Sequence, residues 1–348
     1  MTELLVPIHQ VLAIPKAELP DSTAWDKLAP HWPGADDTSR VGQWDAKVRL
    51  FRYLAKAAKV KAHSYRALCG DLRLFFEWCR TRDLACLPAT PDTVVAFLKD
   101  QAEIKRPTSV KRYLASIAKA HKLAHVTNPV SHEAVKLALD ELYEQDHSEP
   151  MQAEALRWAH IKVALSNMGD RLIDCRDRAL VQVAYDILAR CSEMPRLTVE
   201  GLTTAGAHAK LQVIRSKRSK KGRVQHKYLA PSTLTAVNTW CERAGIHEGY
   251  LFRGVSKGGQ VLDAPLSDAG VGRALQRVAK AAGLDPRGFS GHSCRVGACQ
   301  DMSIAGMDIH QIMLAGDWDS PDMPAYYARK VAPDKSGMAK LAEIQNRS

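Results

Sequence analysis

The chain has 348 residues, more than one typical hydrophobic core organises, so we expect two domains. Its 49 Lys and Arg residues exceed its 38 Asp and Glu residues, and the net charge of +11 favours a polyanionic partner, nucleic acid before membrane. No apolar run approaches a membrane span and the first residues lack a signal-peptide pattern, so an integral membrane protein or a secreted protein is not expected.

Eight cysteines are scattered along the chain without a C-x-x-C pair or the spacing of a zinc site. They fall within helical patterns, where Cys commonly acts as a small buried hydrophobe. We therefore expect a reducing compartment, no structural disulfide and no bound metal.

Prolines divide the first half of the chain. Residues 1–40 are rich in them and predict an irregular arm. Residues 41–145 have a helical pattern that predicts a bundle of four or five helices. The breaks in this pattern fall near four prolines, Pro88, Pro91, Pro107 and Pro129. The polar stretch 146–152 interrupts the pattern and is interpreted as an interdomain linker, which leaves 153–348 for the second domain.

Two helices of the predicted bundle carry basic residues opposite an apolar stripe. The basic residues are Arg66 and Arg73 in the first helix, and Lys111 and Arg112 in the second. Such a face is often only solvated surface. Small residues that would let a helix approach a duplex favour DNA contact instead, namely Gly70, Ala115 and Ser116.

The second domain begins with predicted helices over about 153–168 and 175–189. A short helix then follows, with Ser192 as its N-cap and Glu193 in its first turn. A later helix, over 266–283, carries three basic residues, Arg273, Arg277 and Lys280.

Strand character is confined to the runs 210–216 and 224–229, which are joined by the basic turn KRSKKGR. They predict a β-hairpin or a three-stranded sheet. Helices resume from about residue 232, so we expect a mainly α protein with a small β-sheet.

The stretch Ser290–Arg329 holds residues suited to anion chemistry. His292 and Arg295 lie one helical turn apart, so both can point into one cavity. Arg offers a permanently charged fork for phosphate oxygens, and His moves protons near neutral pH. Tyr327 can be a nucleophile, but a phenol with a pKa of about 10 needs cationic neighbours or a base to react near pH 7. Taken singly, each residue also fits an ordinary structural role.

The upstream chain adds Arg190 and Glu193 after an apolar helix, and Lys217 in the basic turn. The ordered set is Arg190, Glu193, Lys217, His292, Arg295, Trp318 and Tyr327. This set resembles the active site of the tyrosine recombinases. Further similarity lies in SGHSCRVGACQDM, in the run from AGMDIHQIM to AGDW, in the Tyr-x-Arg that follows, in VAYDILARCSEMPRLTV and in the N-terminal LLVPIHQVLAIP. The resemblance covers most of the chain and is strongest after about residue 175.

The resemblance implies a two-domain, C-shaped DNA clamp, with a helical core-binding domain before an α+β catalytic domain. It implies a site-specific recombinase that acts on a double-stranded site with inverted repeats, as a dimer on one site and a tetramer in the synapse. Cleavage would form a 3′-phosphotyrosyl bond, and strand exchange would pass through a Holliday junction. No cofactor or metal is implied. The expected location is the cytoplasm, on the nucleoid, of a prokaryote or a phage or plasmid host.

The resemblance assigns each residue a part in phosphoryl transfer. Arg190 and Arg295 would hold the phosphate, His292 would assist deprotonation of Tyr327, and Lys217 would protonate the leaving 5′ oxygen. Trp318 would contact the phosphate or pack the nucleophile helix, and Glu193 would orient its neighbours. Lys220 and Lys221 compete with Lys217, and Tyr326 competes with Tyr327. The preceding Arg-Ser and the nine-residue spacing from the Trp favour the assigned residues.

The resemblance also implies that the 266–283 helix, with Arg273 and Arg277, reads bases in the major groove. Ala269 and Gly272 stand where a characterised member has base-contacting residues, so the target site is expected to differ. The C-terminal stretch 334–345 carries an apolar stripe that docks on a neighbouring protomer in the family or, alternatively, packs on its own chain.

Two prolines, Pro321 and Pro324, precede Tyr327 and predict a nucleophile helix that begins late or with an irregular first turn.

Three other functions remain open at this point. A type IB topoisomerase would share the chemistry but act as a monomer. An integrase that needs accessory proteins would usually carry an arm-binding domain, and a non-catalytic DNA-binding protein would bind without cleaving.

Overall fold

The structure is a computed structural model that describes residues 50, 53, 62–148, 152–205, 208–215 and 223–347. It divides into two compact units, Met1–Glu149 (unit 1) and Pro150–Ser348 (unit 2), and each is described by itself. The predicted arm over residues 1–40 lies outside the described residues. No helix in the described ranges is both long enough and apolar enough to cross a membrane.

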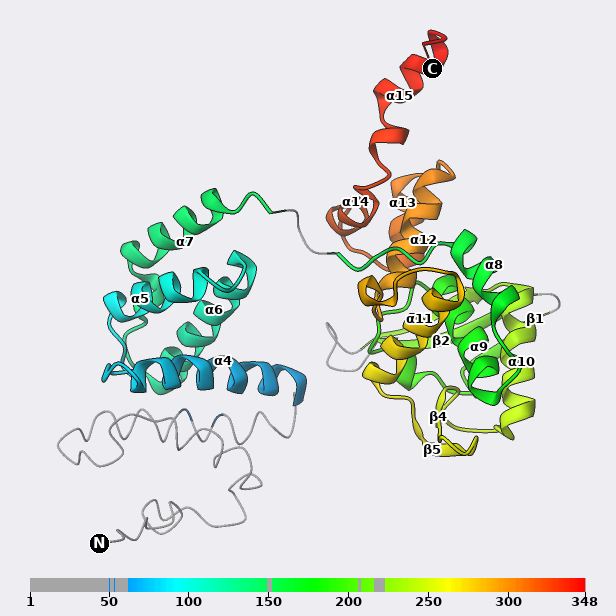
Figure 1. Cartoon of the computed structure of the whole chain (residues 1–348), viewed down its shortest axis with the longest axis horizontal. Coiled ribbons are helices and arrows are strands. Elements are labelled where there is room, and N and C mark those ends of the chain that lie inside the picture. The colour runs from blue at the N-terminus through cyan, green and yellow to red at the C-terminus, as the bar shows by residue number, and fades with distance from the viewer. Residues whose placement is uncertain are drawn as a thin grey trace, which may run out of the picture. The chain divides into compact units, whose positions relative to one another are not determined.

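Unit 1 is helical (Figure 1). Its described elements are α4 (Ala62–Arg80), α5 (Pro91–Ala102), α6 (Pro107–Ala124), η3 (Pro129–Ser131) and α7 (Glu133–Gln145). Three of the four prolines predicted to break the helical pattern are the first residues of helices. Proline fixes a helical φ, and the N–H that it lacks would have no partner in the first turn. The core closes over Leu72, Phe97 and Ile117, each at most 1% exposed.

A buried carboxylate joins α4 to α6 in unit 1. Asp71 accepts hydrogen bonds from Arg112 Nη1 at 2.5 Å and from Ser116 Oγ at 2.7 Å. Burial raises the pKa of the Asp71 carboxyl, while the Ser116 and Arg112 contacts act to lower it. Ser116 is therefore buried against α4, and its predicted place on an exposed face of α6 is wrong.

Unit 2 combines helices with two small sheets. Its helices are α8 (Trp158–Asn167), α9 (Leu172–Asp186), η4 (Met194–Arg196), α10 (Pro231–Ala244), α11 (Asp268–Ala281), η5 (Pro286–Gly288), α12 (Ser293–Ile304), α13 (Ile309–Gly316), α14 (Asp322–Ala328), η6 (Pro333–Lys335) and α15 (Gly337–Ile344). Its strands are β1 (Leu202–Ala205), β2 (His208–Arg215), β3 (Arg223–Leu229), β4 (Arg253–Val255) and β5 (Val261–Pro265).

Strands β1, β2 and β3 form an antiparallel sheet in that order, with Leu202 opposite Leu211 and Ile214 opposite Val224. The structure thus confirms a mainly α fold with a small β-sheet. The hairpin β4–β5 was not predicted. Its strands are short and none of their residues is buried, and the Gly-Gly turn between them was the available signal.

The segment before α8, Gln152–Arg157, is extended, so the helix predicted from residue 153 begins five residues later. We call this segment the strap. Glu154 N–H donates to Gly288 O at 2.9 Å and Leu156 N–H donates to Ser293 O at 3.0 Å. Leu156 is fully buried, and a Cβ on Gly297 of α12 would overlap its carbonyl group. Close backbone packing therefore overrides the helical periodicity.

Two local predictions fail in the loop after α9. The helix predicted to reach residue 189 ends at Asp186. The N-cap of the next short helix is Glu193, not Ser192, and the Glu193 carboxylate makes no capping bond because it binds Arg190.

A buried imidazole, His121 of α6, ties unit 1 together. Its Nε2 accepts the Ala89 N–H at 2.9 Å, and its Nδ1 lies 2.9 Å from the Ile117 carbonyl, to which it donates. Both bonds suit the neutral ring. Burial lowers the pKa of His121 below its ordinary value of 6.5.

We therefore expect unit 1 to lose stability as pH falls through 6.5 towards the lowered pKa, because the unfolded chain binds a proton there that the folded chain does not. Hydrogen exchange of α6 amides in the full chain, corrected for intrinsic rates at each pH, measures the opening free energy. His121→Gln should flatten the pH dependence, whereas exposed His147→Gln should leave it unchanged. A wild-type slope in His121→Gln would assign the effect elsewhere.

Candidate active site

The site is organised by Arg295, which lies in α12 and is 2% exposed. Its Nη1 donates to the Leu188 carbonyl at 2.5 Å and its Nη2 donates to the Gly316 carbonyl at 2.7 Å. Its guanidinium carbon lies 4.2 Å from the centre of the Trp318 ring, within the range of a cation–π contact. Arg295 thus joins the chain beyond α9, the end of α13 and Trp318.

Trp318 reaches this position because of the residues around the end of α13. Asp308 begins the helix with a capping box that includes Gln311. Asp317, in the left-handed region at φ 53°, ends it and turns the chain back. A Cβ on Gly316 would overlap the Trp318 ring, so only glycine permits this contact.

The helix α14 carries both candidate tyrosines. Pro321 is its N-cap and Pro324 is its third residue, so the prediction of a late start or an irregular first turn is wrong. The first N–H groups of a helix have no partner inside it, and a proline there removes no bond.

The two tyrosines have different neighbours. The Tyr327 ring centre lies 5.8 Å from that of Trp318, so Tyr327 adjoins the Arg295 cluster. The Tyr326 ring lies under the Arg329 guanidinium at 4.1 Å. Both phenols are half-buried.

Arg190 follows the loop that Arg295 fixes. Leu188, two residues earlier, has φ 47°, an unusual conformation for a bulky residue, and its carbonyl is held by Arg295. Glu193 accepts from Arg190 N–H and from Arg190 Nη1, both at 2.8 Å. The Glu193 side chain is 8% exposed and that of Arg190 is 33% exposed, so the carboxylate holds the guanidinium from the protein side.

His292 is the N-cap of α12, three residues before Arg295, and its side chain is exposed. The structure therefore groups Arg295, Trp318 and Tyr327, because Trp318 contacts each of the other two. Short stretches of backbone join Arg190 and His292 to this group. Lys217 and its competitors Lys220 and Lys221 lie outside the described residues.

Of the DNA-binding candidates in unit 1, Arg73 and Lys111 are exposed on α4 and α6. Arg112 is half-exposed and paired with Asp71. The side chain of Arg66 lies outside what the structure describes.

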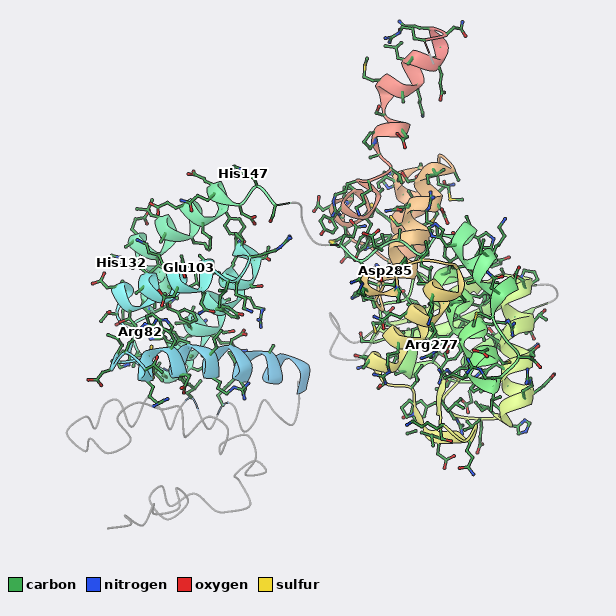
Figure 2. All side chains as sticks on the ribbon, viewed as in Figure 1. Arg82, Glu103, His132, His147, Arg277 and Asp285 are labelled. Atoms are coloured by element: carbon green, nitrogen blue, oxygen red, sulfur yellow. The ribbon has the colours of Figure 1, made fainter. Side chains whose placement is uncertain are left out.

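On α11 of unit 2, Arg273 is exposed, whereas Arg277 is held by an acidic side chain. Arg277, labelled in Figure 2, donates from Nε at 2.7 Å to Asp177, a fully buried carboxylate of α9. Asp177 also pairs with the buried Arg176 at 2.8 Å. Arg277 thus pins α11 to α9.

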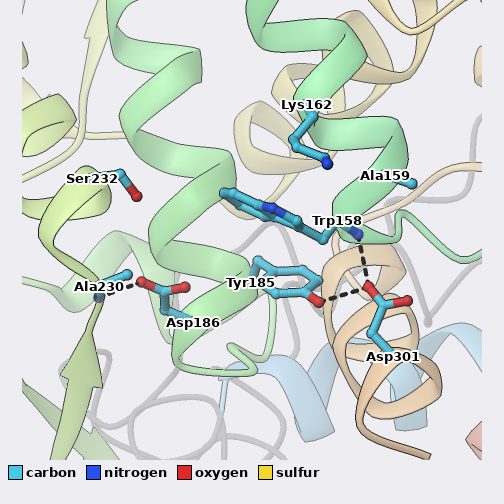
Figure 3. A pocket seen from close by; sticks show the side chains of 8 residues that line it. All are labelled: Trp158, Ala159, Lys162, Tyr185, Asp186, Ala230, Ser232 and Asp301. Carbon is cyan, nitrogen blue, oxygen red and sulfur yellow. Dashed lines mark hydrogen bonds between the residues drawn. The ribbon is translucent and has the colours of Figure 1, made fainter. Parts of the chain in front are cut away.

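A pocket of about 530 Å³ lies beside the start of α8 (Figure 3). Asp301 of α12 accepts there from the Tyr185 hydroxyl at 2.6 Å and from the Trp158 N–H at 2.8 Å. Burial and the Asp301 carboxylate raise the pKa of Tyr185 above its usual range, so this phenol is a structural donor rather than a nucleophile. Nothing in the sequence pattern singled out Tyr185 or Asp301.

None of the eight cysteines, all of which the structure describes, forms a disulfide. Within the described part of the chain, no three His, Cys, Asp or Glu side chains are grouped closely enough to hold a metal ion.

Comparisons with known proteins cover both units. Residues 155–332 match the Phage integrase family, and residues 48–126 match the Phage integrase, N-terminal SAM-like domain. The recombinase Cre of Escherichia phage P1 is 25% identical over 303 residues, which span 81% of this chain and 88% of Cre. An integrase/recombinase XerD homologue of Selenomonas ruminantium is 26% identical over 267 residues, 72% of this chain and 76% of the homologue.

Solved structures share the fold. The XerH site-specific recombinase in a post-cleavage complex with palindromic difH substrate has a TM-score of 0.57 and 13% identity, over 92% of this chain and 88% of XerH. A lambda integrase(75–356) dimer bound to a COC′ core site has a TM-score of 0.55 and 16% identity, over 81% of this chain and 94% of that one.

Gly316→Ala should displace Trp318 and strain the Arg295 contacts, at a cost of about 1–3 kcal/mol in the free energy of unfolding of unit 2. Urea unfolding followed by tryptophan fluorescence measures this cost. Gly258→Ala is the matched control, because a Cβ there would meet nothing closer than 3.8 Å. Equal stability of the two variants would show that Gly316 is not required for the Trp318 position.

Proposed function

The chain belongs to the phage integrase family of tyrosine site-specific recombinases, and we propose that Tyr327 cleaves DNA by forming a 3′-phosphotyrosyl bond. The observation that carries this proposal is the cluster of Arg295, Trp318 and Tyr327, with Arg190 held by Glu193 beside the same loop. Trp318 contacts both the Tyr327 ring and the guanidinium of Arg295, which is fixed and permanently charged.

The transition state of phosphoryl transfer spreads negative charge over the non-bridging oxygens. Arg190 and Arg295 would bind these oxygens, and the burial of Arg295 strengthens its attraction for an anion because the local dielectric constant is low. Two arginines supply positive charge without a divalent cation, so we propose a metal-independent reaction.

In the proposed step, the Tyr327 oxygen attacks phosphorus and the bond from phosphorus to the 5′ oxygen breaks. His292 assists removal of the phenolic proton, and Lys217 protonates the departing 5′ oxygen. Trp318 packs against the nucleophile, and Glu193 orients Arg190. The phosphotyrosyl bond keeps the energy of the broken bond, so a 5′ hydroxyl from a second duplex can attack it. Two such exchanges, through a Holliday junction, complete recombination.

We propose a double-stranded DNA site with inverted repeats as the partner. The complexes of the similar XerH and lambda integrase with their sites support a DNA partner. The proposed division is a core-DNA-binding domain at 41–145, a linker at 146–152 and a catalytic domain at 153–348. The exposed basic residues Arg73, Lys111 and Arg273 are the favoured DNA contacts, and the paired Arg112 and Arg277 would also position their helices.

Assembly into a dimer on one site and a tetramer of two sites is proposed from α15. Its apolar residues Met338, Leu341 and Ile344 are 65%, 39% and 78% exposed, and none of its residues is buried in its own chain. Such a short helix needs a partner surface to be stable. This favours recombination over a monomeric topoisomerase-like activity.

A nicked duplex that traps cleavage tests the nucleophile. The site is first selected by binding from random-sequence DNA, and the reaction is run with EDTA. Wild type and Tyr326→Phe should form a denaturation-resistant protein–DNA adduct, whereas Tyr327→Phe should lose it by more than about 1,000-fold because the attacking oxygen is gone.

An adduct in Tyr327→Phe would move the nucleophile to Tyr326 or elsewhere. Specific binding without any adduct would favour the non-catalytic DNA-binding protein, and dependence on added Mg²⁺ would contradict the metal-independent reaction. Relaxation of supercoiled DNA that lacks the site would favour the topoisomerase-like activity.

The double change Met338→Lys and Ile344→Lys should weaken assembly on DNA by about tenfold or more, because lysine cannot be buried without a partner. Light scattering of protein–DNA complexes measures the number of protomers. Lys340→Ala, also in α15, should assemble normally. Normal assembly of the double variant would show that α15 is not the interface.

A further inference from the structure

Groups outside the helix that carries Tyr327 bind its last carbonyls. Helix α14 has seven residues, and the last carbonyls of any helix lack partners within it. In the chain that follows, Val331 N–H at 2.8 Å and Ala332 N–H at 2.9 Å donate to the Ala328 carbonyl. A two-turn helix is marginal alone, so side chains that bind its remaining carbonyls decide its position.

Side-chain amides supply the missing donors at Tyr327. The Tyr327 carbonyl accepts from Gln152 Nε2 at 3.1 Å and from Gln300 Nε2 at 3.2 Å. The preceding carbonyl, of Tyr326, accepts from Arg329 Nη1 at 2.7 Å. Arg329 Nη1 also donates to Gln152 Oε1, so the Gln152 amide binds the helix end with both its atoms.

These two glutamines come from elements that are themselves fixed. Gln300 is 4% exposed and lies on α12, five residues after Arg295. Gln152 begins the strap, which is hydrogen-bonded to Gly288 and Ser293. One side chain from the strap and one from α12 therefore bind the same carbonyl, that of Tyr327, whose ring lies beside Trp318.

We propose that Gln152 and Gln300 are positioning residues for the nucleophile, and this inference rests on the assignment of Tyr327. They cap α14 at the Tyr327 carbonyl and hold its phenol towards the Arg295 cluster. Gln152 is also the last residue of the predicted linker, and its side-chain amide binds the helix that carries the nucleophile. Neither residue contacts the reacting atoms.

Gln152→Ala and Gln300→Ala should each slow adduct formation at saturating DNA by about 3- to 10-fold, the effect of one lost hydrogen bond, and the double variant should be slower still. The dissociation constant for the site should stay within about twofold of wild type. This split between rate and affinity separates positioning of Tyr327 from general loss of structure.

Gln152→Glu sharpens the test, because a carboxylate still accepts from Arg329 but has no N–H to donate to the Tyr327 carbonyl. It should be as slow as Gln152→Ala if the Tyr327 contact matters, and as fast as wild type if Gln152 serves only to anchor Arg329. The control is Glu154→Gln. Glu154 lies on the same strap, and this change affects only its exposed contact with Lys330.

Hydrogen exchange of α14 amides in the DNA-free chain supplies a readout that does not depend on catalysis. Faster exchange in Gln152→Ala and Gln300→Ala than in Glu154→Gln supports the cap, and equal exchange overturns it. If wild type forms no adduct, the proposed nucleophile fails and the exchange result alone decides whether the glutamines position α14. If wild type reacts and all glutamine variants match its rate, the inference is overturned while the proposed function stands.

Discussion

The buried guanidinium of Arg295 is the interaction on which the site depends. A charged group removed from water needs hydrogen-bond partners, and here the Leu188 and Gly316 carbonyls provide them. The bond to Leu188 spans 107 residues of the chain, and the bond to Gly316 spans 21. Satisfying one buried charge thereby sets the loop that leads to Arg190 and the turn that presents Trp318. The same two hydrogen bonds offset the cost of burying the charge and fix the geometry of the site.

Much of the site could be predicted from sequence because its chemistry lies in residue types at short spacings. His292 and Arg295 one turn apart, and Tyr327 nine residues after Trp318, are visible in the letters alone. The contacts of Gln152 and Gln300 are not, because glutamine is an ordinary polar residue and each pairing spans distant segments. The strap was mistaken for helix because periodicity reports local preference, while its backbone packs against Gly297.

The charge pattern of a helix face does not show whether an arginine already has an acidic partner within the fold. Arg112 and Arg277 belong to basic faces, yet each binds a buried carboxylate, Asp71 or Asp177. Those partners lie 41 and 100 residues away in sequence, so no local pattern reveals them. The same arginine can thus serve packing as well as DNA contact, and only the fold shows which side chains already have an acidic partner.

The strap also decides where the catalytic half of this protein can be separated from the rest. Although its first residue, Gln152, belongs to the predicted linker, the strap packs its backbone against α12, and the Gln152 side chain binds the end of α14. A fragment that starts at the first helix of unit 2, at Trp158, would lose those contacts and leave Gly297 of α12 uncovered. A chimera between related recombinases should therefore be joined upstream of Gln152. The strap then stays in the same segment as the catalytic residues.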